Sequence, residues 1–212
     1  MFLSIIKSKK SYFISVSTVL VLANLFLFFY GKKDSFLILN TYHSYFLDHF
    51  FQIITFLGDG IFFLIISALL FGLNKKKESL LSLLTFLLSG LFSQILKNYF
   101  HRLRPVNFFE SYSYSKFIEG FTNATYNSFP SGHTTSIFAA ITLWVFFIEK
   151  KSYHLLLLFT ALLVGYSRIY LGQHFLEDVI LGIVIGVSTS LLIIGIVLKV
   201  KKTSSQQYFS KY

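Results

Sequence analysis

Two histidines and an aspartate stand at positions that suit nucleophilic catalysis. His174 and Asp178 are four residues apart, so on a helix they share one face and the carboxylate can hold one imidazole N–H. The other ring nitrogen is then free to attack a substrate. His133 belongs to a different segment and can donate the proton that a departing alkoxide or phosphate needs. The three residues therefore predict a catalytic group in which one histidine attacks and the other protonates.

Positively charged side chains accompany these catalytic candidates. The chain has three arginines, Arg102, Arg104 and Arg168, and all lie in the short polar stretches that also hold or adjoin the histidines. An arginine can bind a phosphate through two parallel hydrogen bonds, which an ammonium group cannot do. Lys97, Arg104 and Arg168 would bring three charges together, and burying them unpaired would be costly. A bound phosphate would neutralise them.

The segment before His133 suits the start of a helix that binds an anion. Pro130 is favoured in the first turn of a helix, and Ser131 and Gly132 can turn a hydroxyl and free backbone N–H groups toward the ligand. The predicted phosphate-binding residues are therefore Lys97, Arg104, Ser131, Gly132 and Arg168.

Long apolar segments must position these residues. The chain is 54% hydrophobic, 19% aromatic and 13% charged, which is far from the average for soluble domains. Six stretches with few or no charges are each about long enough for a helix to cross a bilayer, at 11–30, 50–73, 79–97, 133–149, 152–171 and 178–198. We expect an all-α polytopic membrane protein, with six transmembrane helices in one domain over residues 1–200. Residues 201–212 would form a short polar tail without regular structure.

The lysines predict the orientation. Twelve of the sixteen fall on one side of the six-span layout, which places both termini in the cytoplasm and the active site outside the cell (inner) membrane. This topology also explains the net charge of +10, so we expect no nucleic-acid partner. The chain has no cysteine, which excludes a thiolate metal site. A metal on the two histidines and the aspartate is disfavoured by the surrounding positive charges.

Three motifs resemble those of a known family. The patterns Lys-x6-Arg-Pro, Pro-Ser-Gly-His and Ser-Arg-x5-His-x3-Asp are similar at every fixed position to those of the type 2 phosphatidic acid phosphatases, a family of lipid phosphate phosphatases. The resemblance implies a bacterial six-span phosphatase that needs no metal and no cofactor. It also implies that His174 forms a phosphohistidine, that Asp178 orients it and that His133 protonates the leaving group. The five phosphate-binding residues would hold the phosphoryl oxygens as charge builds up.

The sequence does not determine which lipid is the substrate or which group accepts the phosphoryl group. A lipid is favoured because the uncharged parts of the fourth and fifth spans, 134–148 and 152–167, are short at the motif end, which would let the site dip into the head-group layer. Undecaprenyl diphosphate, phosphatidylglycerophosphate, phosphatidate and the phosphates of lipid A all fit. Transfer to a lipid hydroxyl instead of water is one alternative. A non-catalytic lipid-binding or transport protein is another, but it would not need the His174 and Asp178 spacing. No obligatory protein partner is evident.

Three further features each have two interpretations. Asp59, between two glycines in the second span, is interpreted as a structural hydrogen-bonding residue rather than a substrate contact. His101 and Arg102 flank the first motif and are either solvated loop residues or contacts to a diphosphate or a neighbouring head group. Aromatic residues crowd the loop between the first two motifs and form either a membrane-surface belt or a lid. They are Phe108, Phe109, Tyr112, Tyr114, Phe117, Phe121, Tyr126 and Phe129.

Overall fold

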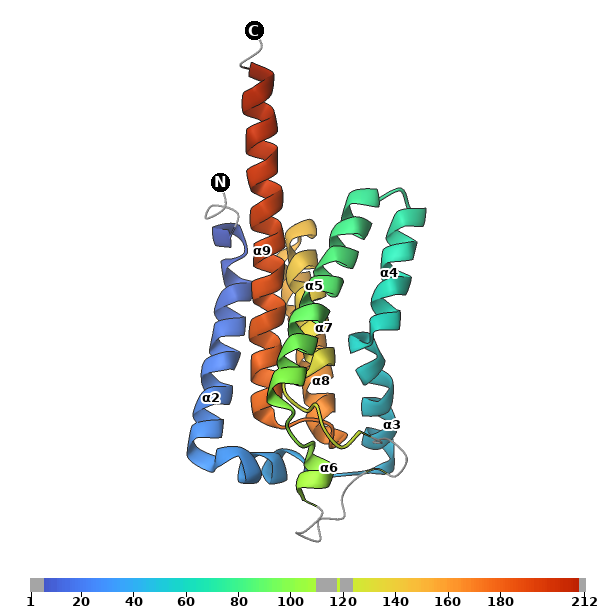
Figure 1. The fold of residues 1–212 in the computed structure, drawn as a ribbon, viewed down its shortest axis with the longest axis vertical. Coiled ribbons are helices and arrows are strands. Elements are labelled where there is room, and N and C mark those ends of the chain that lie inside the picture. Colours follow the sequence, from blue (N-terminus) through green and yellow to red (C-terminus); the bar gives the residue numbers. More distant parts are fainter. Residues whose placement is uncertain (1–5, 110–117, 119–123, 210–212) are drawn as a thin grey trace.

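The computed structural model describes residues 6–109, 118 and 124–209, with side chains up to residue 200. Throughout this part the regular structure is helical, which confirms the predicted all-α class (Figure 1). The elements are α2 (Lys10–Leu39), α3 (Tyr45–Ile54), the 3-10 helix η1 (Thr55–Gly58), α4 (Gly60–Gly72), α5 (Lys76–Phe100), α6 (Pro105–Phe108), α7 (Gly132–Phe147), α8 (Lys151–Tyr170) and α9 (Leu176–Phe209).

Five of the predicted spans each coincide with one helix, whereas the span at 50–73 is divided among α3, η1 and α4. The helices differ in how well they suit a membrane. In the described part, four are long and apolar enough to cross it, namely α2, α5 with α6, α8, and α9 as far as Val200. The pair formed by α3 with η1 and α4 makes a fifth, bent by 55°. α7 is apolar but has only 16 residues, fewer than the roughly 20 that a straight crossing needs. Six spans therefore stay a prediction.

Two helices change direction at identifiable residues. α2 contains Gly31 at φ 67°, a left-handed conformation that glycine adopts without strain, and the segment after it turns across the end of the bundle (Figure 1). The second span breaks between Gly58 and Gly60, where Asp59 is extended and its Oδ1 accepts the N–H of Ile61 at 2.9 Å. Asp59 is thus the N-cap of α4, which confirms the structural hydrogen bond expected of it.

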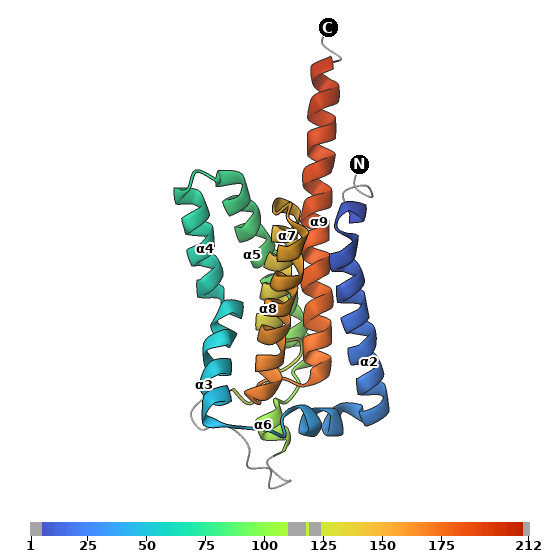
Figure 2. The same ribbon diagram turned by 180° about the vertical axis from the view of Figure 1, so that it is seen from behind.

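The core lies around α7. In Figures 1 and 2, α5, α7, α8 and α9 occupy the middle, with α2 on one side and α3 and α4 on the other. α7 is buried along most of its length and packs most extensively against α9. Gly182 of α9 permits this approach, because a Cβ there would lie 2.9 Å from Thr134 Cβ and 3.0 Å from the Ser131 carbonyl oxygen. The start of α7 is thereby held against α9.

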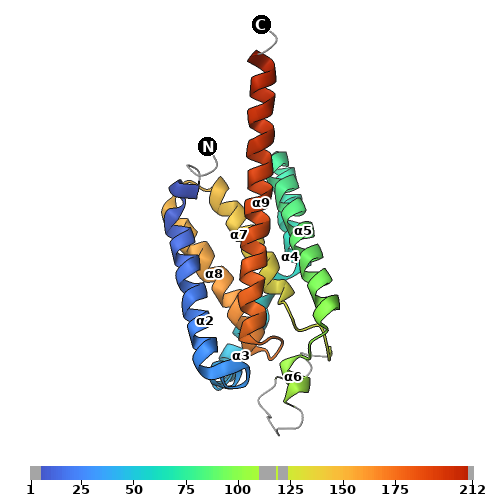
Figure 3. The same cartoon turned by 60° about the vertical axis from the view of Figure 1, so that its left-hand side comes forward.

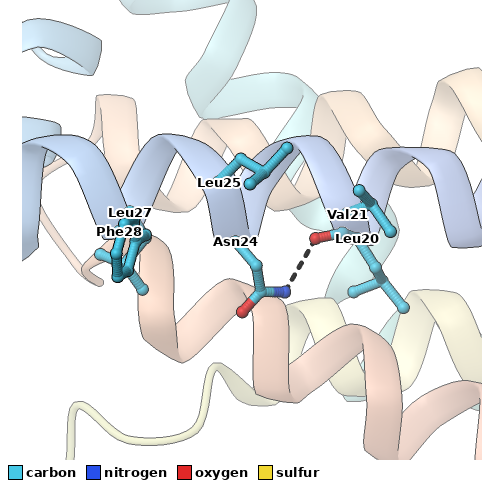
Figure 4. Close-up of a pocket in the computed structure, with 6 residues that line it drawn as sticks. All are labelled: Leu20, Val21, Asn24, Leu25, Leu27 and Phe28. Atoms are coloured by element: carbon cyan, nitrogen blue, oxygen red, sulfur yellow. Dashed lines mark hydrogen bonds between the residues drawn. The ribbon is translucent and has the colours of Figure 1, made fainter.

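The peripheral helix α2 shows the opposite pattern. Many of its apolar side chains are exposed, including Phe28 at 81% and Val21 at 58%, as expected for a surface that faces lipid. Figure 4 shows a shallow hollow on this helix, where Asn24 donates from Nδ2 to the Leu20 carbonyl oxygen at 2.8 Å. The amide donor is therefore satisfied within the helix, so it does not mark a polar site.

The two ends of the bundle are chemically different. The start of α2, the end of α9 and the connections from α4 to α5 and from α7 to α8 lie at one end (Figures 1 and 3). Lys9 Nζ donates to the Ile148 carbonyl oxygen at 2.7 Å across this end. The segments that carry the three motifs meet at the opposite end. The lysines at 9–10, 75–77 and 150–151 thus lie at the end away from the motifs, whereas Lys32 lies at the motif end, 3.0 Å from Glu177 Oε1.

The C-terminal part differs from the prediction. α9 continues as a helix to Phe209, so the expectation that the polar tail lacks regular structure is wrong for residues 201–209. The helix continues because this stretch lacks proline and glycine, and polar residues such as lysine and glutamine propagate a helix well.

Candidate active site

His174 and Asp178 form a pair at the start of α9. His174 lies in the connection between α8 and α9, and Asp178 lies in the first turn of α9. His174 Nδ1 is 3.4 Å from Asp178 Oδ2, and the two side chains are 2% and 0% exposed. This long hydrogen bond engages one ring nitrogen and leaves Nε2 as the nitrogen that can attack.

Asp178 is fixed by further hydrogen bonds. Its Oδ2 accepts the Ser128 hydroxyl at 2.5 Å and the Phe175 N–H at 2.9 Å. Its main-chain oxygen accepts the Ser131 N–H at 3.0 Å, which ties the second motif to the third. A carboxylate held by several donors has little freedom to move, so it can orient His174.

The surroundings keep His174 uncharged. Burial lowers the pKa of His174 well below its ordinary value, and the positive charges of Lys97, Arg104 and Arg168 lower it further. A hydrogen bond with the backbone of Ser128 acts in the opposite direction but is the smaller effect. A neutral imidazole keeps the lone pair that a nucleophile needs.

Three cations converge on this histidine. Lys97 comes from the last turn of α5, Arg104 from the connection to α6 and Arg168 from the last turn of α8. Within the described ranges, none of the three has a carboxylate oxygen within 4.0 Å. Unpaired positive charge in partly buried surroundings is unfavourable, so this cluster favours an anionic ligand.

The two arginines are held by neutral oxygens. Arg168 is 5% exposed and donates from NH1 to Thr55 Oγ1 at 2.6 Å, while its Nε has no partner in the part of the chain described. Arg104 donates from NH1 to Gln173 Oε1 at 2.6 Å and from Nε to the Tyr126 carbonyl oxygen at 3.2 Å. These contacts fix both guanidinium groups, while no described carboxylate lies within 4.0 Å of either one.

The start of α7 offers backbone donors beside Lys97. Ser131 is the N-cap, and its hydroxyl accepts the Thr134 N–H at 3.4 Å and the Thr134 hydroxyl at 2.8 Å. The Ser131 side chain is fully buried, so the structure gives its hydroxyl a capping role. The N–H groups of Gly132 and His133, in the first turn, have no carbonyl to bind inside the helix. A Cβ on Gly132 would lie 3.7 Å from Lys97 Nζ, so the ammonium lies next to this backbone.

The eight predicted site residues therefore gather at one end of the bundle. Lys97, Arg104, His133 and Arg168 all act electrostatically on one another or on His174. His133 is 28% exposed, and Asp59 is the acidic residue nearest to it among those described. In the same ranges, no group of three or more His, Cys, Asp or Glu side chains could hold a metal ion.

Sequence reasoning missed three polar residues that support this site. Ser128 holds Asp178, Gln173 holds Arg104, and Thr55 holds Arg168. Only Gln173 carried a signal, because it stands directly before His174 in a connection that is otherwise mostly apolar. Ser128 and Thr55 reach the site through packing alone.

Arg102 and His101 engage in contacts with the protein. Arg102 NH1 donates to Glu177 Oε1 at 2.9 Å, and its guanidinium lies 4.3 Å from the centre of the Phe129 ring. His101 is exposed and stacks on Tyr126 with 4.5 Å between the ring centres. These contacts favour structural and solvated roles over a diphosphate contact.

Part of the aromatic loop packs inward. Phe109 is 1% exposed and stacks on Phe36 at 5.2 Å, and Phe108 meets Phe175 edge-on at 5.3 Å. Tyr112, Tyr114, Phe117 and Phe121 lie outside the described residues. The choice between a belt and a lid is therefore untested.

Comparison with known proteins agrees with the geometry. The PAP2 superfamily matches residues 78–202, which is more than half of the chain. The chain belongs to the PAP2 superfamily. This confirms the predicted family and, with it, the prediction that the chain is a phosphatase.

Several known phosphatases resemble the chain over most of its length. Phosphatidylglycerophosphatase B of Bacillus subtilis is 33% identical over 162 residues, covering 70% of this chain and 74% of the relative. The lipid A 4'-phosphatase of Porphyromonas gingivalis is 33% identical over 162 residues, covering 73% and 68%. The crystal structure of the first transmembrane PAP2 type phosphatidylglycerolphosphate phosphatase from Bacillus subtilis matches with a TM-score of 0.68 and 25% identity, covering 88% of this chain and 96% of that one.

Proposed function

We propose that this PAP2 protein hydrolyses the terminal phosphate of a membrane lipid through a phosphohistidine on His174. One observation carries the proposal: Lys97, Arg104 and Arg168 surround a neutral, carboxylate-oriented imidazole, and no described carboxylate pairs with any of the three cations. A phosphate would supply the missing negative charge and place its phosphorus beside the nucleophile.

In the first step, His174 Nε2 attacks the phosphorus atom and the bond from phosphorus to the leaving oxygen breaks. His133 donates a proton to that oxygen, which leaves as an alcohol or as a phosphate monoester. Asp178 stabilises the positive charge that develops on the His174 ring. The three cations and the free N–H groups at the start of α7 hold the phosphoryl oxygens as their charge increases. Ser131 supports these N–H groups as the N-cap of α7.

In the second step, water attacks the phosphohistidine and the phosphorus–nitrogen bond breaks. His133, now neutral, accepts a proton from that water, so both histidines return to their starting states. Inorganic phosphate is released. The proposed reaction needs no redox partner, because no atom changes oxidation state.

Two structural features support a lipid substrate. α7 has only 16 residues, and its N-terminus carries Ser131 to His133, so the site would lie below the membrane surface. An apolar groove between α5 and α9 runs up to Leu96, the residue directly before Lys97. Its lining suits a hydrocarbon chain, and it consists of Phe92, Ile95, Leu96, Val184, Ile185, Ser188, Thr189 and Leu192.

The relatives' names narrow the substrate classes. They include a phosphatidylglycerophosphatase and lipid A phosphatases, so a glycerophospholipid and a lipid A phosphate are the first candidates for this chain. Undecaprenyl diphosphate and phosphatidate complete the panel. Purified protein in detergent is expected to release phosphate from at least one of these four lipids. Release from none, with the protein folded, would contradict the proposal.

We further propose that the chain crosses the cell membrane six times, with cytoplasmic termini and an outward-facing site. The lysine-rich segments at the end opposite the motifs support this orientation. Since the chain has no cysteine, Ala124→Cys in an exposed connection at the site end and Lys76→Cys at the other end are clean probes. Ala124→Cys should react with a membrane-impermeant thiol reagent in intact cells, and Lys76→Cys only after permeabilisation. The reverse order would contradict the orientation.

Transfer of the phosphoryl group to a lipid hydroxyl is the alternative, because the same residues would serve. A substrate with radiolabelled terminal phosphate distinguishes the two reactions when a lipid acceptor is present. Hydrolysis predicts label in inorganic phosphate, whereas transfer would place it on the acceptor lipid.

A further inference from the structure

The break in the second span brings two polar residues to the active site. Thr55 is the first residue of η1 and Asp59 directly follows η1, and both precede residues 78–202, the region that matches the PAP2 superfamily. Thr55 Oγ1 accepts from Arg168 NH1 at 2.6 Å. Asp59 Oδ2 lies 3.8 Å from His133 Nε2. The break therefore contacts both a phosphate-binding arginine and the proposed proton donor.

The two oxygens of Asp59 have different roles. Oδ1 accepts the Ile61 N–H and caps α4, while Oδ2 is the atom nearest His133. A separation of 3.8 Å is longer than a hydrogen bond, so the proton on Nε2 stays available for a leaving oxygen. At that distance the carboxylate acts on the imidazole through its charge.

Gly58 makes this approach possible. A Cβ at Gly58 would lie 2.9 Å from His133 Cβ and 3.0 Å from the His133 carbonyl oxygen, and 2.7 Å from Val164 Cγ1. A larger residue would push the break away from α7 and α8. Asp59 is thus placed beside His133 by close backbone packing.

We propose that Asp59 is a positioning residue for His133, whose carboxylate stabilises the protonated imidazole that donates to the leaving oxygen. The inference rests on the proposed function and deepens it. The structure then contains two histidine–carboxylate pairs, one for the nucleophile and one for the proton donor.

The electrostatic surroundings of His133 explain why a carboxylate is needed. Lys97, Arg104 and Arg168 all carry positive charge and act electrostatically on this imidazole. Asp59 is the one described acid within 4.0 Å of it. Opposite charge at short range favours the protonated ring. The two side chains are 28% and 37% exposed, so water can supply the next proton.

The test compares two substrates that share a hydrocarbon chain but differ in leaving group. An alkyl phosphate loses an alkoxide and needs the proton, whereas a nitrophenyl phosphate loses a stabilised phenolate and hardly needs it. Asp59→Asn and Asp59→Ser both keep an N-cap for α4 but remove the charge. Asp34→Asn makes the same chemical change at an exposed position in α2 and serves as the control.

Both Asp59 variants should lower kcat for the alkyl phosphate by about tenfold to a hundredfold and change kcat for the nitrophenyl phosphate by less than about threefold. Asp34→Asn should match wild type on both. Equal losses on the two substrates would mean that Asp59 acts on Arg168 or on the fold and not on proton donation, which would overturn the proposal. No loss on either substrate would remove Asp59 from the reaction. If wild type cleaves neither ester nor any lipid of the panel, the proposed function itself fails.

Discussion

The two histidines of the site lie beside carboxylates in opposite surroundings. His174 and Asp178 are buried and four residues apart in sequence, and the carboxylate is held by Ser128 and Phe175. His133, in α7, and Asp59, in the break before α4, are partly exposed. The first pair sits in a rigid, water-poor environment, and the second pair faces an open one.

This difference matches what each histidine must do. A nucleophile must stay unprotonated and aligned, which burial and a fixed carboxylate provide. A group that gives and takes protons must exchange them with water in every cycle, which requires exposure. The comparison suggests that burial, more than residue type, separates the two roles.

The largest effects on kcat are expected when each imidazole is removed in turn. These two variants also test the difference between the nucleophile and the proton donor. His174→Ala should abolish turnover of alkyl and nitrophenyl phosphates alike, because no neighbouring group replaces Nε2. His133→Ala should slow the alkyl phosphate by about 10²–10⁴-fold and the nitrophenyl phosphate much less. Steady-state kcat on both substrates measures this. Activity of His174→Ala within about tenfold of wild type would contradict the nucleophile.

Arg168, one of the three cations that act on both histidines, gives the next largest effect. Arg168→Lys keeps the charge but loses the planar fork, so we expect about a hundredfold loss of kcat/KM on both substrates, equivalent to about 3 kcal/mol. Lys75→Arg, at the opposite end of the bundle, should have no effect. A nearly silent Arg168→Lys would show that charge alone suffices.

A smaller effect is expected at the bend of the second span. Thr55→Val removes the hydroxyl that accepts from Arg168 and leaves a buried donor unpaired. The expected loss of kcat/KM is about tenfold, or roughly 1.4 kcal/mol. Thr160→Val is the matched control, since Thr160 donates to Leu156 within its own helix. Equal activity in the two variants would mean that Thr55 does not position Arg168.

The smallest predicted effect is a difference in the free energy of unfolding between variants of the two carboxylates. Asp178→Asn disturbs a buried acceptor of several hydrogen bonds and should cost about 1–3 kcal/mol. Asp59→Asn should cost only a few tenths of a kcal/mol, because asparagine caps a helix as well as aspartate. Thermal unfolding in detergent compares them. If the midpoint temperature of unfolding fell by a similar amount in both variants, the proposed contrast between a rigid and an open histidine–carboxylate pair would be contradicted.

The same contrast shows what could be predicted from sequence. His174 with Asp178, and Arg104 within its motif, were recognisable because local spacing on a helix determines their relation. Asp59 with His133 is a contact across 74 positions, created by a break at Gly58 and Gly60 that apolar periodicity does not reveal. Ser128 and Thr55 escaped notice for the same reason. The apolar runs predicted the helices, but they did not predict the turn at Gly31 or the continuation of α9 to Phe209.

Direct trapping of the covalent intermediate tests the central claim most directly. Wild-type protein is mixed with a lipid carrying a radiolabelled terminal phosphate, quenched within milliseconds in alkaline detergent and digested. We expect acid-labile label on the peptide that contains His174, appearing before free phosphate and disappearing on a chase with unlabelled lipid, and no label in His174→Ala. Phosphate release from wild type in a single turnover without labelled protein, or with label on another residue, would contradict the account.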